Sequence, residues 1–142
     1  MKNFGRIAIT LILLFTATAI SYAATEYNYV SPEKMKMSME DGVPMLIVDI
    51  QIKEEFSKSH ITGSMATYAY PAKAEADTAK LQPVLAKYRE DKKQIVIVCP
   101  RGKGGAKRSY DYLAAAGVDQ KDLVILEKGM AGWPYASLTE SL

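Results

Sequence analysis

The chain has 142 residues, a length that suits one domain and not comfortably two. Its formal net charge is +2, and residues 1–23 contain two cations, Lys2 and Arg6, and no acidic residue. Residues 24–142 therefore carry 16 Lys and Arg against 16 Asp and Glu, a balance that gives no reason to expect a nucleic-acid partner.

The first 23 residues have the three parts of a secretory signal peptide. Lys2 and Arg6 give a positive start, residues 7–20 are mostly apolar, and Ser21 and Ala23 place small side chains before a cut at Ala24. The alternative is an uncleaved membrane anchor, but this run is shorter than the ~20 residues that a bilayer span needs. We expect residues 1–23 to be removed, leaving a periplasmic or secreted protein with no stable membrane anchor.

The remaining chain is predicted to be an N-terminal extension over 24–30 and a single domain over 31–142, in which helices and strands alternate. A helix begins after the N-cap Ser31, with Pro32 in its first turn, and ends near Glu40. The next expected elements are a strand over 45–50, a short helix over 53–58, a turn over 60–63 and a brief strand over 64–68. A helix over 74–90, which Pro83 interrupts, and a strand over 95–98 follow. The last expected elements are a helix from Gly105 or Ala106 to Ala116 that Gly117 closes, a strand over 123–126, and a glycine-rich turn with a short helical piece over 129–134.

The strands are continuous apolar runs, which is typical of strands buried on both faces. Their alternation with helices predicts an α/β fold of three layers, a mostly parallel central sheet flanked by helices. In such sheets, ligands bind beyond the carboxyl ends of the strands. Cys99 directly follows the strand over 95–98 and therefore lies at such an end.

Cys99 is the only cysteine in the chain and has no partner for an internal disulfide. In an oxidising compartment, an odd cysteine indicates a bridge between molecules, as in a homodimer, or a reactive sulfur. An inert, buried structural cysteine is the alternative.

The loop after Cys99 favours the reactive sulfur. Glycines allow successive backbone amides to converge on an anion, and the start of the following helix adds its positive end. Cationic side chains nearby favour thiolate over thiol. The residues expected to form this anion cradle, together with the amides of 100–105, are Arg101, Gly102, Lys103, Gly104, Gly105, Lys107 and Arg108.

A cysteine phosphatase or an arsenate-reductase-like enzyme would also use an anion cradle. The phosphatase template needs an arginine six residues after the cysteine, where this chain has Gly105. We therefore keep that chemistry only as a minor alternative.

Three ordered segments carry a resemblance to a known family. They are LIVDI at 46–50 with EEF at 54–56 and HITGS at 60–64, IVIVC at 95–99, and LEKGMAGW at 126–133. Over roughly residues 31–135 the chain resembles a rhodanese-like domain, the fold of single-domain sulfurtransferases.

The resemblance implies a central parallel sheet flanked by helices and a catalytic cysteine at position 99. Such a cysteine takes a sulfane sulfur from a small anionic donor, thiosulfate or polysulfide, and passes it from a persulfide to a thiol or cyanide acceptor. No cofactor and no metal are implied. The alternative is a non-catalytic sulfide or polysulfide carrier, or a docking module, that keeps the fold.

Two positions depart from the family's pattern. The family usually has an arginine where this chain has Gly104, whereas Arg108 comes four residues later, so the loop is predicted to be longer. The family often has an arginine two residues after the aspartate that ends the first strand, where this chain has Gln51. These departures bear on the identity of the donor.

Other residues also have side chains suited to chemistry. His60, the only histidine, could activate Cys99 but is expected to bond to backbone instead. Asp49 is predicted to support the site by orienting loop backbone or pairing with a cation. Met35, Met37 and Met39 could bind Cu(I), but at helical spacing two of them share a face and are expected in the core.

Overall fold

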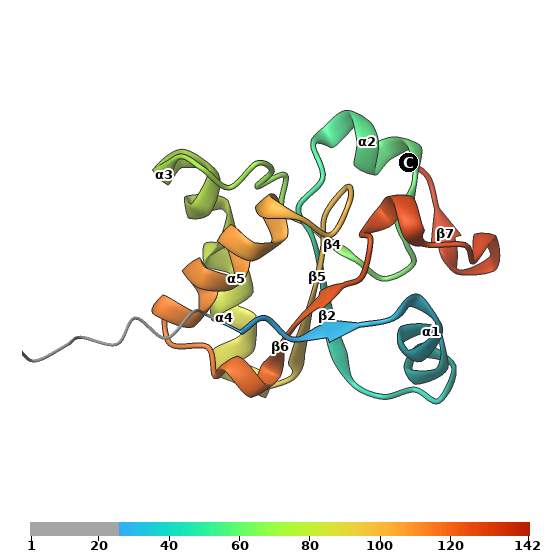
Figure 1. Ribbon diagram of the computed structural model, residues 1–142, viewed down its shortest axis with the longest axis horizontal. Coiled ribbons are helices and arrows are strands. Elements are labelled where there is room, and N and C mark those ends of the chain that lie inside the picture. The colour runs from blue at the N-terminus through green and yellow to red at the C-terminus, as the bar shows by residue number, and fades with distance from the viewer. Residues whose placement is uncertain (1–25) are drawn as a thin grey trace, which may run out of the picture.

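The computed structural model describes residues 26–142, and the predicted signal peptide over 1–23 lies outside the described residues. A five-stranded sheet forms the centre of the molecule (Figure 1). Its order is β1 (Tyr29–Val30), β6 (Leu123–Leu126), β5 (Gln94–Val98), β2 (Met45–Asp49) and β4 (Met65–Ala66), and every neighbouring pair is parallel. The predicted parallel α/β sheet is confirmed.

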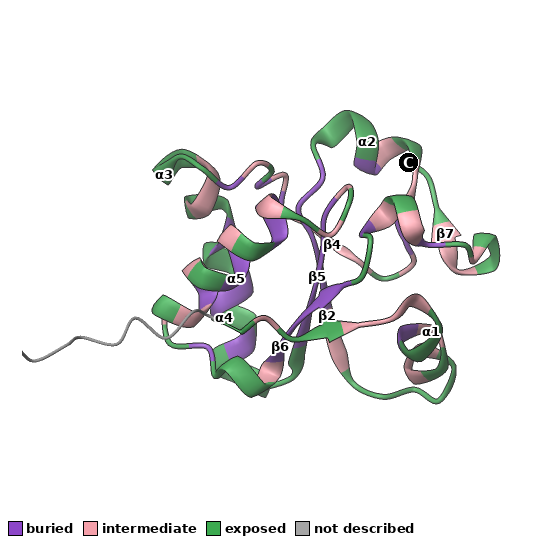
Figure 2. Ribbon diagram, viewed as in Figure 1, coloured by how far each residue is buried: buried purple, intermediate pink, exposed green. Residues whose placement is uncertain are grey.

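Successive side chains of a strand point to opposite faces of the sheet, so each buried strand presents apolar side chains on both faces. Helices cover both of these faces. Ile95 and Ile97 of β5 join one core cluster, whereas Val96 and Val98 join another. The first cluster lies under α4 (Gln82–Asp91) and α5 (Gly104–Ala115), and the second includes Met35 of α1 (Pro32–Glu40). Figure 2 shows the buried strands between these outer layers, as the predicted three-layer arrangement requires.

Most predicted helices begin and end where local signals place them. The Ser31 side chain accepts a hydrogen bond from the Lys34 amide at 3.2 Å and so caps α1. The helix α2 (Lys53–Lys58) also matches its prediction. The helix predicted over 74–90 is instead α3 (Glu75–Thr78), the 3-10 turn η1 (Ala79–Leu81) and α4, in which Pro83 occupies the first turn.

The turn predicted over 60–63 is confined to residues 62–63. His60–Ile61 forms β3, which pairs antiparallel with β7 (Thr139–Glu140) near the end of the chain. The extended lead-in contributes Tyr29–Val30 as an edge strand on β6. Both pairings join segments far apart in sequence, which local patterns do not reveal.

Three short 3-10 turns complete the chain: η2 (Gln120–Asp122), η3 (Met130–Gly132) and η4 (Ala136–Leu138). None of the helices described between residues 26 and 142 combines the length and the apolar character that a membrane span requires.

In α1, Met35 is buried and Met39 packs against the same core cluster, while Met37 is exposed. The expected core role is therefore confirmed for Met35 and Met39, whereas Met37, which leaves the other side of the helix, lies outside the core.

Candidate active site

Cys99 lies at the carboxyl end of β5, where the chain leaves the sheet and enters the loop before α5. It is 2% exposed and lines a pocket of about 800 Å³. The Gly102 amide donates a hydrogen bond to Cys99 Sγ at 2.9 Å, which folds the loop back over the sulfur. No side chain caps the first turn of α5, so its amide groups face the loop without a local acceptor among the described side chains.

A second segment holds this loop in place from the other side. The Met130 amide donates to the Cys99 carbonyl at 2.8 Å, and the Ala131 amide donates to the Pro100 carbonyl at 3.0 Å. Gly129 has φ +59°, and a Cβ there would overlap the Cys99 carbonyl oxygen and lie 2.6 Å from the Gly102 nitrogen. The backbone around Cys99 therefore depends on a glycine thirty residues further along the chain.

The pocket has three main walls. One is the loop from Cys99 to Gly105, the second is the segment from Gln51 to Ser59 that follows β2, and the third runs from Met130 to Thr139. Its charged lining residues are Glu55, Lys58, Arg101 and Lys103. The first two walls meet because the carboxyl ends of β2 and β5 are neighbours in the sheet.

The structure brings together only part of the predicted cradle. Arg101, Lys103, Gly104 and Gly105 line the pocket, and Gly102 contacts the sulfur through its amide. Lys107 and Arg108 do not line it. Because α5 begins at Gly104, these two side chains project from the helix after its first turn, rather than from the loop.

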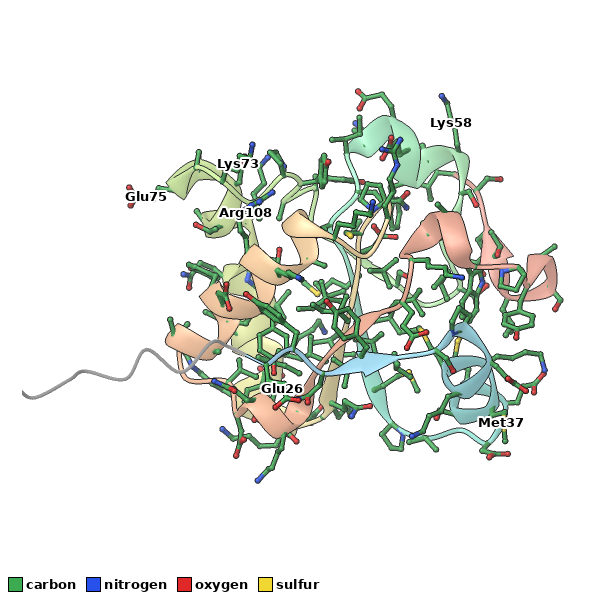
Figure 3. The ribbon with its side chains drawn as sticks, in the orientation of Figure 1. Glu26, Met37, Lys58, Lys73, Glu75 and Arg108 are labelled. Atoms are coloured by element: carbon green, nitrogen blue, oxygen red, sulfur yellow. The ribbon has the colours of Figure 1, made fainter. Side chains whose placement is uncertain are left out.

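Lys107 and Arg108 have partners elsewhere. Lys107 Nζ lies 5.1 Å from the centre of the Tyr27 ring. The guanidinium group of Arg108 donates to the Pro71 carbonyl from Nε at 3.0 Å and from a terminal nitrogen at 2.8 Å. Figure 3 shows Arg108 on the side of α5 that faces α3, apart from Lys58 at the end of α2.

Asp49 orients backbone, as predicted, but it has no cation within 4.0 Å among residues 26–142. Its carboxylate accepts hydrogen bonds from the Gln51 amide at 2.8 Å and from Gln51 Nε2 at 3.0 Å. Burial raises the pKa of Asp49 from 3.8 to about 6, against the opposing effect of these hydrogen bonds. Asp49 thus fixes Gln51, which lines the pocket.

His60 has a structural place and is not among the residues that line the pocket. Its Nδ1 lies 2.9 Å from the Phe56 carbonyl oxygen, and its ring stacks on Phe56 at 3.9 Å between centroids. The expected bond to backbone is confirmed.

Sequence reasoning missed the wall after β2 and much of the third wall. The missed lining residues include Glu55, Lys58, Ser59, Tyr70, Ala136 and Thr139. The carboxyl-end rule that located Cys99 also applies to β2, and it could have found Glu55 and Lys58 on the following helix. Thr139 could not be found this way, because the β3–β7 pairing brings it to the pocket.

Trp133 lines the pocket and has an unpaired donor. Its Nε1 is buried and has no hydrogen-bond partner among the described residues. Its ring meets Tyr135 edge-on at 5.0 Å between centroids.

Residues 26–142 bring together no cluster of three His, Cys, Asp or Glu side chains suited to a metal ion.

Comparison with known proteins gives the same picture of the fold. The model of the rhodanese-like domain matches residues 31–136. No curated protein is similar enough in sequence to count as a relative.

Solved structures with the same fold have low sequence identity to this chain. A rhodanese-like domain protein from Staphylococcus aureus is 24% identical, with a TM-score of 0.61 over 81% of this chain and 98% of its own. An As-Sb reductase from Leishmania major is 16% identical, with a TM-score of 0.62 over 82% and 86%. A thiosulfate sulfurtransferase from Pseudomonas aeruginosa is 19% identical, with a TM-score of 0.56 over 82% of this chain and 20% of its own.

Proposed function

Since the chain belongs to the rhodanese-like domain family, we propose that it is a sulfurtransferase that works through a persulfide on Cys99. The donor is a small anion, thiosulfate or polysulfide, and the acceptor is thiophilic. The observation that carries the proposal is the position of Cys99, a residue that lines the pocket and whose Sγ accepts a hydrogen bond from the Gly102 amide at 2.9 Å. The signal-peptide pattern of residues 1–23 supports a periplasmic or secreted location.

The proposed reaction has two balanced steps. The Cys99 thiolate attacks the outer sulfur of thiosulfate, the sulfur–sulfur bond of the donor breaks, and sulfite leaves with the electron pair. The acceptor then attacks the outer sulfur of the Cys99 persulfide, and Cys99 leaves as a thiolate, ready for another cycle. Arg101, Lys103 and the amides at the start of α5 stabilise the anionic donor and the leaving sulfite.

Mass spectrometry of the intact protein tests the first step. After exposure to thiosulfate or polysulfide, the protein is expected to gain one sulfur atom, about 32 Da, as a persulfide. Cys99→Ser removes the only thiol and is expected to remain unmodified. The absence of a mass gain with both donors would contradict the proposal.

Turnover separates an enzyme from a carrier that keeps the same fold. An enzyme is expected to transfer many equivalents of sulfur to cyanide per Cys99. A single equivalent released without further cycles would instead support the sulfur carrier.

The four cations of the loop and α5 give a matched set of variants. Removing Arg101 or Lys103 is expected to raise KM for thiosulfate about threefold each, the size of an exposed charge interaction. Lys107→Ala and Arg108→Ala remove the same charge outside the pocket, so they are expected to change KM by less than about 1.5-fold. Steady-state kinetics at fixed ionic strength provides the measurement, and equal effects in all four variants would contradict this assignment.

A further inference from the structure

The pocket is much larger than the proposed donor. A water molecule takes about 30 Å³ in the liquid, so an anion the size of thiosulfate needs roughly 150 Å³. The pocket measures about 800 Å³, within the range of sites that hold organic ligands of considerable size. The cationic loop forms one wall, which leaves the wall from Gln51 to Ser59 for a second molecule.

Gln51 presents an unpaired acceptor on that wall. Its Nε2 donates to Asp49 at 3.0 Å and to the Ser59 carbonyl at 3.1 Å, and both partners are acceptors. This network fixes the orientation of the amide and occupies both of its hydrogens. No described residue donates to Gln51 Oε1, although the side chain is only 4% exposed and lines the pocket.

Gln51 shares the pocket with the reacting cysteine. The Ile50 amide donates to the Val98 carbonyl at 2.9 Å, so β2 and β5 remain side by side up to Cys99. Gln51 follows Ile50, as Pro100 follows Cys99. Gln51 and Cys99 thus come from the neighbouring ends of β2 and β5, and both line the pocket.

Glu55 adds a negative charge to the same wall. It lies on α2, lines the pocket and has no ion pair within 4.0 Å among residues 26–142. Lys58, one turn further along α2, also lines the pocket but does not pair with it. An amide oxygen and a free carboxylate together suit a ligand with several N–H donors and a positive charge, which describes an ammonium group.

We infer that Gln51 and Glu55 form an ammonium subsite for the sulfur acceptor, which is a small thiol bearing a primary amine. This inference rests on the proposed sulfurtransferase function. In the second step, the thiolate of the acceptor attacks the outer sulfur of the Cys99 persulfide, and the acceptor leaves as a persulfide. A carboxylate on such a thiol finds Arg101 and Lys103 on the adjoining loop wall.

Unloading of the persulfide tests the subsite directly. Wild-type protein is loaded with thiosulfate, loading is confirmed by mass, and the loss of sulfur is followed with cysteamine, 2-mercaptoethanol or cyanide below saturation. Glu55→Gln is expected to slow unloading by cysteamine about fivefold and to change the other two rates by less than about 1.5-fold. Comparing each acceptor across variants removes differences in the intrinsic reactivity of the thiols.

Glu54→Gln is the matched control, because Glu54 is the adjacent glutamate of α2, is exposed and does not line the pocket. It is expected to leave all three rates unchanged. Charge reversal in Glu55→Lys is expected to slow cysteamine further and to speed unloading by the anionic thiol 3-mercaptopropionate.

The outcomes distinguish the two proposals. Failure of Cys99 to load contradicts the sulfurtransferase itself. Normal loading followed by equal effects of Glu55→Gln on cysteamine and 2-mercaptoethanol, or by equal effects of Glu54→Gln and Glu55→Gln, overturns the ammonium subsite alone.

Discussion

Gly129→Ala is expected to destabilise the protein by about 4 kcal/mol and to reduce sulfur transfer by about a hundredfold in the molecules that remain folded. Gly129 combines φ +59° with ψ −152°, a backbone conformation that is essentially confined to glycine. The added methyl group would also overlap the Cys99 carbonyl oxygen. Relief of this overlap has to move the loop that carries Cys99, and a displacement of about 1 Å is enough to cost such a factor in rate.

Urea unfolding and the rate of persulfide formation measure the two effects. Gly42→Ala is the control for a positive φ, because Gly42 has φ +67° and a Cβ there meets nothing within 4 Å. It is expected to cost about 1 kcal/mol and to leave the rate unchanged. Wild-type rates in Gly129→Ala would show that the segment after β6 does not position Cys99.

Asp49 is expected to make the free energy of unfolding fall by about 3 kcal/mol as the pH rises from below 4 to above 6. Its pKa is about 6 in the folded protein and 3.8 when unperturbed, so the folded state binds this proton more tightly. The stabilisation is fully present below the unfolded pKa and is lost as the pH passes through the folded pKa. The cause is burial of the carboxylate, which lies against Gln51 without a neutralising cation among the described residues.

The difference in unfolding free energy between wild type and Asp49→Asn isolates this group, because asparagine cannot ionise. Denaturant unfolding between about pH 3.5 and about pH 7 is expected to show that the wild type loses stability relative to Asp49→Asn as the pH rises. Asp77→Asn provides a control of opposite sign. The amides of Ala74 and Lys73 lower the pKa of Asp77, so its contribution is lost as the pH falls. A difference that does not vary with pH for Asp49→Asn would contradict a perturbed buried carboxylate.

The central sheet and the position of Cys99 could be predicted because they depend on local signals. Apolar runs mark β2, β5 and β6, and Ser31 marks the start of α1. The general geometry of parallel sheets then places Cys99 at the edge where ligands bind. These signals do not depend on which distant segments come together.

The rest of the site depends on contacts that the sequence does not display. Lys107 and Arg108 follow Cys99 closely in sequence, but they do not line the pocket, because their side chains leave α5 and contact Tyr27 and Pro71 instead. Glu55 reaches the pocket through the neighbouring strand, and Thr139 reaches it through a strand pairing with residues far earlier in the chain. Charge near a cysteine in sequence is therefore only a partial guide to charge in its pocket.

The attachment of the Cys99 loop at both ends has a consequence for redesign. The carbonyls of Cys99 and Pro100 are held by the amides of Met130 and Ala131, and α5 fixes the other end from Gly104. Between these anchors, Arg101 and Lys103 are exposed and line the pocket. For the proposed sulfurtransferase, libraries randomised at these two positions are expected to vary the choice of donor while the backbone that carries them stays constant.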